Sequence, residues 1–170
     1  MRKLPEQAKP FRREIIDVMP LKNDEWLAIG QQHAIWGSKD RDPEVWEYAQ
    51  MRGARWTGEE SSVTIDFMDG RRLVLMSNPS GVKSFGVLRE RLVDSIVFQQ
   101  HGELSDDSTI HVYVRKDASG GLFVQTVHNT VQPGHLSDKD IALVQLWETQ
   151  ARDVMGMSPD AGSTQRLQVA

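Results

Sequence analysis

The sequence contains no cysteine among its 170 residues. This absence excludes disulfide bonds, thiolate nucleophiles and cysteine-ligated zinc. The sequence also has no window that approaches the ~18 uninterrupted apolar residues of a membrane-spanning helix. Residues 1–13 carry charges with no apolar segment after them, which argues against a secretion signal. We therefore expect a soluble, cytoplasmic protein with no membrane partner.

The sequence has no large excess of positive charge. Twenty lysines and arginines stand against 24 aspartates and glutamates, which gives a formal net charge of −4. Domains that bind nucleic acid usually carry a basic excess, so we do not expect nucleic acid to bind the body of the chain. At the N-terminus, however, basic residues outnumber the two acids Glu6 and Glu14; they are Arg2, Lys3, Lys9, Arg12 and Arg13. A nucleic-acid-binding accessory protein that contacts phosphates through this arm therefore stays an alternative.

Length and composition are those of one globular domain. Hydrophobic residues make up 39% of the chain and charged residues 26%, which is too apolar for a disordered protein. Pro5 and Pro10 disfavour regular structure at the start, and residues 157–170 are rich in Ser, Gly and Gln with little to bury. We predict a flexible N-terminal arm over 1–10, a single α+β domain over 11–156 and a disordered C-terminal tail over 157–170.

In the first half, the pattern predicts one strand followed by two helices. Apolar residues favour a strand over 13–21. A helix over 24–36 is indicated by Asn23 as its cap, Gly37 as its end and one apolar face of Trp26, Ile29, His33 and Trp36. Asp42-Pro43-Glu44 is typical of a second helix start, and that helix would end near Arg52. We expect Trp26 and Trp36 to be buried.

The pattern over residues 63–156 predicts two hairpins and two helices. An Asp69-Gly70 type I′ turn connects strands within 63–76. A helix capped by Ser84 runs towards Ile96, where 96–98 fits a short strand equally well. A second hairpin spans 109–130, and Ser137 caps a helix that ends at Gly156. The predicted fold is α+β: an antiparallel sheet built from two β-hairpins plus an N-terminal strand, covered by amphipathic helices.

The hairpin over 109–130 carries the candidate site. With Ser119-Gly120 as the turn, His111 lies opposite His128 and Tyr113 opposite Thr126, with Cβ atoms about 5 Å apart in such pairs. The candidate binding face consists of His111, Tyr113, Arg115, Thr126 and His128. Two imidazoles at that spacing can share an anion, a water or a metal ion. A half-exposed sheet without any function, however, carries the same residue types.

Motifs of known enzyme chemistry are missing. The sequence has no HExxH, GxSxG, EF-hand loop or GxGxxG. His128-Asn129-Thr130 has the HxT form that two-histidine phosphoesterases carry twice, but His111-Val112-Tyr113 does not repeat it. We predict no catalytic residue, no metal site and no cofactor.

The function that this pattern favours is a non-catalytic protein-binding or regulatory module. We expect its partner to be a protein, with a homodimer as one form of that partnership. A different class is the alternative: a small hydrolase or phosphoesterase in which His111 and His128 act as an acid–base pair.

Overall fold

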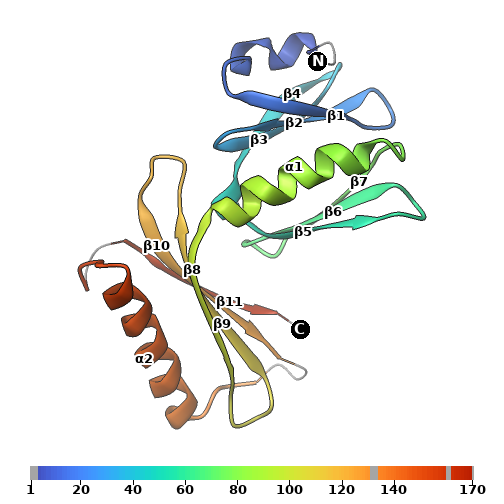
Figure 1. Ribbon diagram of the computed structural model, residues 1–170. Coiled ribbons are helices and arrows are strands. Elements are labelled where there is room, and N and C mark those ends of the chain that lie inside the picture. Colours follow the sequence, from blue (N-terminus) through green and yellow to red (C-terminus); the bar gives the residue numbers. More distant parts are fainter. Residues whose placement is uncertain (1–3, 131–133, 160–161, 170) are drawn as a thin grey trace. The chain divides into compact units, whose positions relative to one another are not determined.

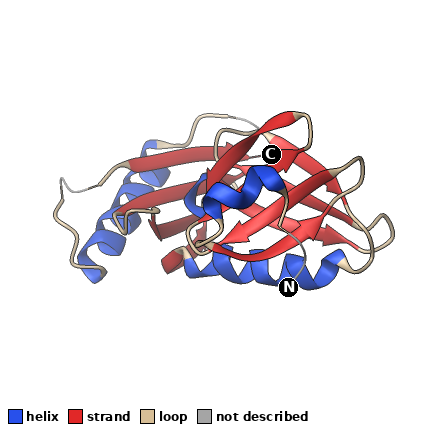
Figure 2. Cartoon of the chain, turned by 90° about the horizontal axis from the view of Figure 1, so that it is seen from above, coloured by secondary structure: helices blue, strands red, loops and turns tan. Residues whose placement is uncertain are grey.

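The computed structural model describes residues 4–130, 134–159 and 162–169. The fold is mixed α+β, rich in strands, with mainly antiparallel sheets (Figures 1 and 2). Chain contacts separate two compact units, residues 1–94 and 95–170. This differs from the single domain predicted over 11–156, because apolar residues on each side of the boundary at 94 gather into cores of their own. In the described part of the chain, no helix is long and apolar enough to cross a membrane.

The first unit contains two antiparallel sheets and one α-helix (Figure 1). Strands β1–β4 form one sheet in sequence order, and β5–β7 form the other. The elements are η1 (Glu6–Phe11), β1 (Ile15–Pro20), β2 (Glu25–Gly30), β3 (His33–Ser38), β4 (Arg41–Glu47), η2 (Tyr48–Gln50), β5 (Met51–Thr57), β6 (Ser62–Phe67), β7 (Arg72–Met76) and α1 (Gly81–Asp94).

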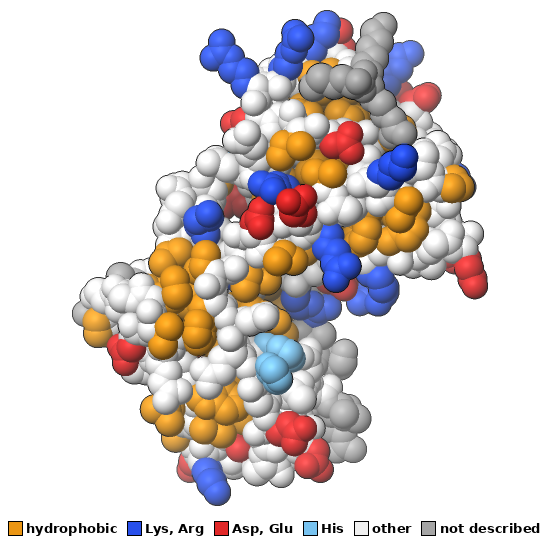
Figure 3. All heavy atoms as spheres, in the orientation of Figure 1, with side chains coloured by type: hydrophobic (Ala, Val, Ile, Leu, Met, Phe, Trp, Pro, Cys, Tyr) orange, Lys and Arg blue, Asp and Glu red, His pale blue; other side chains and the backbone are white. Residues whose placement is uncertain are grey.

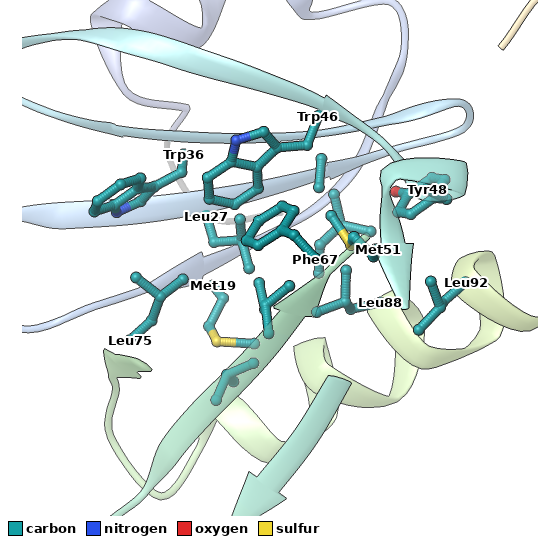
Figure 4. Packing of buried hydrophobic residues seen from close by; sticks show 14 of the residues in the cluster. Met19, Leu27, Trp36, Trp46, Tyr48, Met51, Phe67, Leu75, Leu88 and Leu92 are labelled. Atoms are coloured by element: carbon teal, nitrogen blue, oxygen red, sulfur yellow. The ribbon is translucent and has the colours of Figure 1, made fainter. Parts of the chain in front are cut away.

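Both sheets and α1 contribute to one apolar core in this unit. Leu27 and Ile29 from β2 pack with Phe67 from β6 and Leu88 from α1. The ring of Trp46 lies against Phe67, with centroids 5.1 Å apart in an edge-to-face arrangement (Figure 4). A second, smaller cluster that includes Trp26 lies on the other face of the β1–β4 sheet. Trp26 and Trp36 are both buried, as predicted.

The two predicted helices over 24–36 and 43–52 are wrong, because these residues form β2, β3, β4, the short turn η2 and the start of β5. β2 is buried on both faces: Leu27 and Ile29 face one cluster, and Trp26 and Ala28 face the other. A strand buried on both faces loses the alternation that identifies strands, so Trp26 of β2 and Trp36 of β3 matched a helical period by accident. Pro43 lies in β4, an edge strand of the sheet, where a missing N–H is tolerated.

The hairpin predicted over 63–76 is present as β6 and β7, but its turn type differs from the prediction. Gly70 has a positive φ of 86° whereas Asp69 does not, so the turn is not type I′. The Asp69 carboxylate accepts a hydrogen bond from the Arg71 amide at 2.9 Å. A side-chain cap of this kind favours a type I turn followed by a left-handed glycine.

The second unit contains one sheet and one long helix (Figure 1). Its elements are β8 (Ile96–Glu103), β9 (Thr109–Lys116), β10 (Leu122–Asn129), α2 (Asp138–Val154) and β11 (Thr164–Val169). The strand order is β11-β10-β9-β8, with β11 parallel to β10 and the other neighbours antiparallel. Helix α2 packs on β8, β9 and β10 and covers the apolar cluster of this unit.

The two terminal segments contain regular structure where we predicted a flexible arm and a disordered tail. Residues 6–11 form η1, whose Ala8 is fully buried, and the Gln7 amide donates a hydrogen bond to the Lys39 carbonyl at 2.9 Å. Residues 164–169 form β11. A six-residue strand needs few apolar residues of its own when a neighbouring strand satisfies its backbone, so composition alone did not reveal it.

Candidate functional site

The register of the β9–β10 hairpin differs by one residue from the predicted register. His111 pairs with Val127, and His128 pairs with Ile110. The turn explains the shift: the Asp117 carboxylate accepts hydrogen bonds from the Ser119 and Gly121 amides and closes a loop over 117–121. Because successive side chains of a strand point to opposite faces, His111 and His128 lie on opposite faces of the sheet. His111 and His128 are therefore not neighbours on one face, as the predicted register had placed them.

Thr126 and His128 lie on the face that α2 covers, and both are buried. The Thr126 hydroxyl donates a hydrogen bond to the Glu148 carboxylate of α2 at 2.7 Å. Arg166 of β11 donates two further hydrogen bonds to the same carboxylate, at 2.9 and 2.6 Å. This network connects α2, β10 and β11. Burial raises the pKa of Glu148, but the hydrogen bonds from Arg166 and Thr126 and the charges of Arg166 and Arg152 outweigh burial and lower it overall.

A serine, a histidine and an aspartate meet at the start of β9, but their order differs from a catalytic triad. The Ser108 hydroxyl donates to the Asp106 carboxylate, and the Nε2 atom of His128 lies 2.7 Å from the same hydroxyl oxygen. The hydrogen bonds from Ser108 lower the pKa of Asp106, so this carboxylate accepts. The one hydroxyl proton is thus used, and His128 must donate to Ser108 instead of removing its proton. This arrangement does not activate Ser108 as a nucleophile.

Arg115 is a structural residue. Its side chain is 1% exposed and donates hydrogen bonds to Gln125 at 3.1 Å and to Ser95 at 2.6 Å. Burial lowers the pKa of Arg115 to about 10. A guanidinium buried among these residues connects β9 to β10 and to the start of the unit, and it is not available to bind an external anion.

The face of the sheet opposite α2 carries the histidine arrangement that sequence reasoning missed. His101 of β8 lies directly opposite His111 of β9, and their rings stack with centroids 5.6 Å apart and planes 22° apart. Tyr113 continues the row, 6.0 Å from His111. Burial and the neighbouring His101 lower the pKa of His111. Figure 3 shows histidine at the surface of the second unit.

His101 escaped prediction because the short strand considered for 96–98 ends before it, whereas β8 continues to Glu103. The alternation of buried and exposed residues in β8 was the signal that could have found it: every second side chain from Val97 to Glu103 is exposed. Of the five predicted site residues, only His111 and Tyr113 lie side by side on one face and in contact with solvent. Arg115 shares their face but is buried, and Thr126 and His128 lie on the other face.

The first unit contains a hollow of about 740 Å³ beside η1. Val18, Leu21 and Trp26 provide an apolar lining, and Glu6, Asp24 and Lys39 provide charges. The lining includes no serine, threonine, tyrosine or histidine, so it offers no hydroxyl nucleophile next to a general base.

No group of three or more His, Asp or Glu side chains spaced to hold a metal ion occurs within residues 4–130, 134–159 and 162–169. No protein-family model matches the chain, and no curated protein matches it either.

Proposed function

We propose that this chain is a non-catalytic protein-binding or regulatory module of the cytoplasm, and that β8 is the edge at which an extended segment of another polypeptide docks. An edge strand turns half of its backbone N–H and C=O groups outward, where a further strand can pair with them. Such strand addition is a common mode of peptide recognition.

The observation that carries the proposal is the composition of β8. Edge strands are normally protected against pairing by charges or proline. The other edge strands of the described chain follow this rule: β1 has Asp17, β4 has Pro43, β5 has Arg52, β7 has Arg72 and β11 has Arg166. In β8 the only charged residue is the last one, Glu103, so the seven residues from Ile96 to Gly102 contain no Asp, Glu, Lys, Arg or proline, a longer run than the four residues after Arg72 in β7. Its length of eight residues suits a stable strand pairing.

The exposed side chains of β8 suit an uncharged partner segment. Val97 is 38% exposed, Gln99 and His101 are exposed, and Glu103 at the end is the first charge. The outer face of α2 has the same character, since Ile141 and Leu146 are exposed and the only charged residue between Ile141 and Gln150, Glu148, is buried. Exposed apolar surface of this kind marks protein contacts.

Two glutamines give a matched test by photo-crosslinking. Gln99 lies on β8 and Gln165 lies on β11, the opposite edge of the same sheet, and both are exposed. A photoreactive amino acid replaces one or the other in the full chain, expressed in the native host. We expect a discrete protein adduct from position 99 and none from position 165.

The variant Val97→Lys places a charge on the β8 edge without touching the core, and it should remove the adduct at position 99. An adduct of twice the chain mass identifies a second copy as the occupant; another mass identifies a different protein. Equal crosslinking at both positions, an adduct that survives Val97→Lys, or no adduct at position 99 would each refute docking at β8.

A further inference from the structure

The two imidazoles of His101 and His111 stand side by side on adjacent strands, on the sheet face away from α2. They form a directly opposite pair in the β8–β9 register, and side chains of such pairs project in the same direction from the sheet. Their ring planes are 22° apart. The ring nitrogens farthest from the backbone therefore lie on the same, outer side of the sheet.

Neither imidazole makes a hydrogen bond or ion pair with any residue that the structure describes. The described histidines His33 and His128 differ in this respect: His33 contacts Glu14 at 3.3 Å, and His128 contacts Ser108 at 2.7 Å. His101 is exposed and His111 is half-buried, so an ion in solution can reach both. The nitrogens of this pair are free to bind a ligand from outside.

The surrounding charge favours a cation as that ligand. Residues 95–170 contain nine acidic and five basic residues, and Glu103 lies on the same face, two residues from His101. An anion would need two positive imidazolium rings side by side, and these rings repel each other. Neutral imidazole is a preferred ligand of Zn²⁺, Cu²⁺ and Ni²⁺.

The spacing of the pair is compatible with both rings on one ion. Metal–nitrogen bonds of about 2.0–2.1 Å place two ligating nitrogens roughly 3.3 Å apart in a tetrahedral site. The ring centroids are 5.6 Å apart and the rings are stacked, so a ring must turn until the in-plane nitrogens of both point at one ion. His101 is exposed, and a histidine side chain has two torsions about which its ring can turn without a shift of the backbone.

We propose that His101 and His111 chelate a divalent transition-metal ion of the zinc–copper–nickel class, with water at its remaining coordination positions. With two protein ligands, the site is open and the ion exchanges. This is not a structural metal centre of the four-ligand type. The inference is independent of strand docking at β8, because it needs only one copy of the chain.

The test is a titration of the untagged full chain with Cu²⁺, monitored by electron paramagnetic resonance, and with Zn²⁺, monitored by calorimetry. We expect one bound ion and a copper spectrum with two nitrogen donors. His101→Gln and His111→Gln should each weaken the affinity by roughly tenfold or more, because the second imidazole binds at a high effective concentration once the first is bound. The copper spectrum of each variant should show one nitrogen donor fewer.

His135→Gln and Tyr113→Phe are the matched controls. His135 is an exposed histidine in the segment before α2, and Tyr113→Phe keeps the ring beside His111 while it removes the phenol oxygen. Both should bind metal like the wild type. The proposal fails if His101→Gln or His111→Gln binds as tightly as the wild type, if His135→Gln causes the loss instead, or if millimolar Cu²⁺ gives no saturable binding. Amide NMR spectra of every variant establish that it is folded.

Discussion

The first unit buries mainly aromatic and apolar side chains, whereas the second buries charged side chains as well as an apolar cluster. Among the described residues, the buried polar side chains of the first unit other than Tyr48 are Ser61, Ser62, Thr64, Ser77 and Ser84. Those of the second unit include Arg115, His128, Asp140, Glu148 and Arg152. Four of the five tryptophans belong to the first unit. The stability of the first unit therefore depends mainly on apolar burial, and that of the second depends also on charge and hydrogen bonding.

The architecture accounts for this difference. In the first unit, both sheets and α1 enclose a core, so apolar side chains find partners on several sides. In the second unit, one helix covers one face of one sheet, and polar side chains connect the strand β11 to the helix. We therefore expect the second unit to respond more strongly than the first to pH and to changes of single charged residues.

Trp26→Ala should produce the largest loss of stability in the first unit. Trp26 is 5% exposed and packs against Gly37, so its removal leaves a large cavity that costs about 3–5 kcal/mol. Denaturant unfolding followed by amide NMR separates the two units. Val45→Ala, at an exposed position of β4, is the control and should cost little. A midpoint for the first unit that does not move in Trp26→Ala would contradict its role in the core.

For Trp26 and Trp36, the sequence predicted burial correctly and secondary structure wrongly. The prediction of burial rested on a helical face that the strands β2 and β3 replace. The secondary structure was predicted wrongly because a strand buried on both faces carries no alternation and its length alone did not separate it from a helix. By contrast, the helix after Ser137 was predicted with its cap: Ser137 accepts a hydrogen bond from the Asp140 amide, and local capping chemistry needs no tertiary information.

The candidate site depended on a register that local sequence did not determine. Asp117 closes the β9–β10 loop through its carboxylate, and this shifts the pairing by one residue and separates His111 from His128. The partner that His111 does have, His101, comes from β8, so its identification required the strand order of the sheet. His111 and Tyr113, two residues apart on one strand, were placed on one face correctly, because that relation depends only on strand periodicity.

Truncation after Met157 should cost the second unit about 2–4 kcal/mol and leave the first unit unchanged. We expected this segment to be a disordered tail, but β11 pairs with β10, and Arg166 binds Glu148. Without β11, the strand pairing and these charge-assisted hydrogen bonds are lost together. Gln165→Ala, an exposed position of the same strand, is the control. If the truncated chain shows unchanged amide exchange in β10 and α2, β11 does not contribute to the stability of this unit.

Glu148→Gln should have a smaller effect, a loss of about 1–3 kcal/mol that is confined to the second unit and depends on pH. The Glu148 carboxylate is buried and accepts hydrogen bonds from Thr126 and Arg166, but Arg166 is largely exposed, so solvent weakens the ion pair. Since the folded protein lowers the pKa of Glu148, its stabilising contribution is complete above the unfolded value of about 4.3 and is lost as the pH falls through the folded pKa.

The stability of the second unit should depend on pH differently in the wild type and in Glu148→Gln. The wild-type second unit should lose stability below about pH 5, and Glu148→Gln should lose less over the same range, so that the two curves converge in acid. Glu90→Gln, at an exposed position of α1, is the control and should leave the stability of the second unit unchanged at every pH. Thermal unfolding at a series of pH values, followed by amide NMR, measures the difference. Parallel curves for the wild type and Glu148→Gln would mean that another group controls the acid sensitivity, and the buried Asp140, whose pKa is lowered by hydrogen bonds from Ser105 and Ser137, would be the next residue to replace.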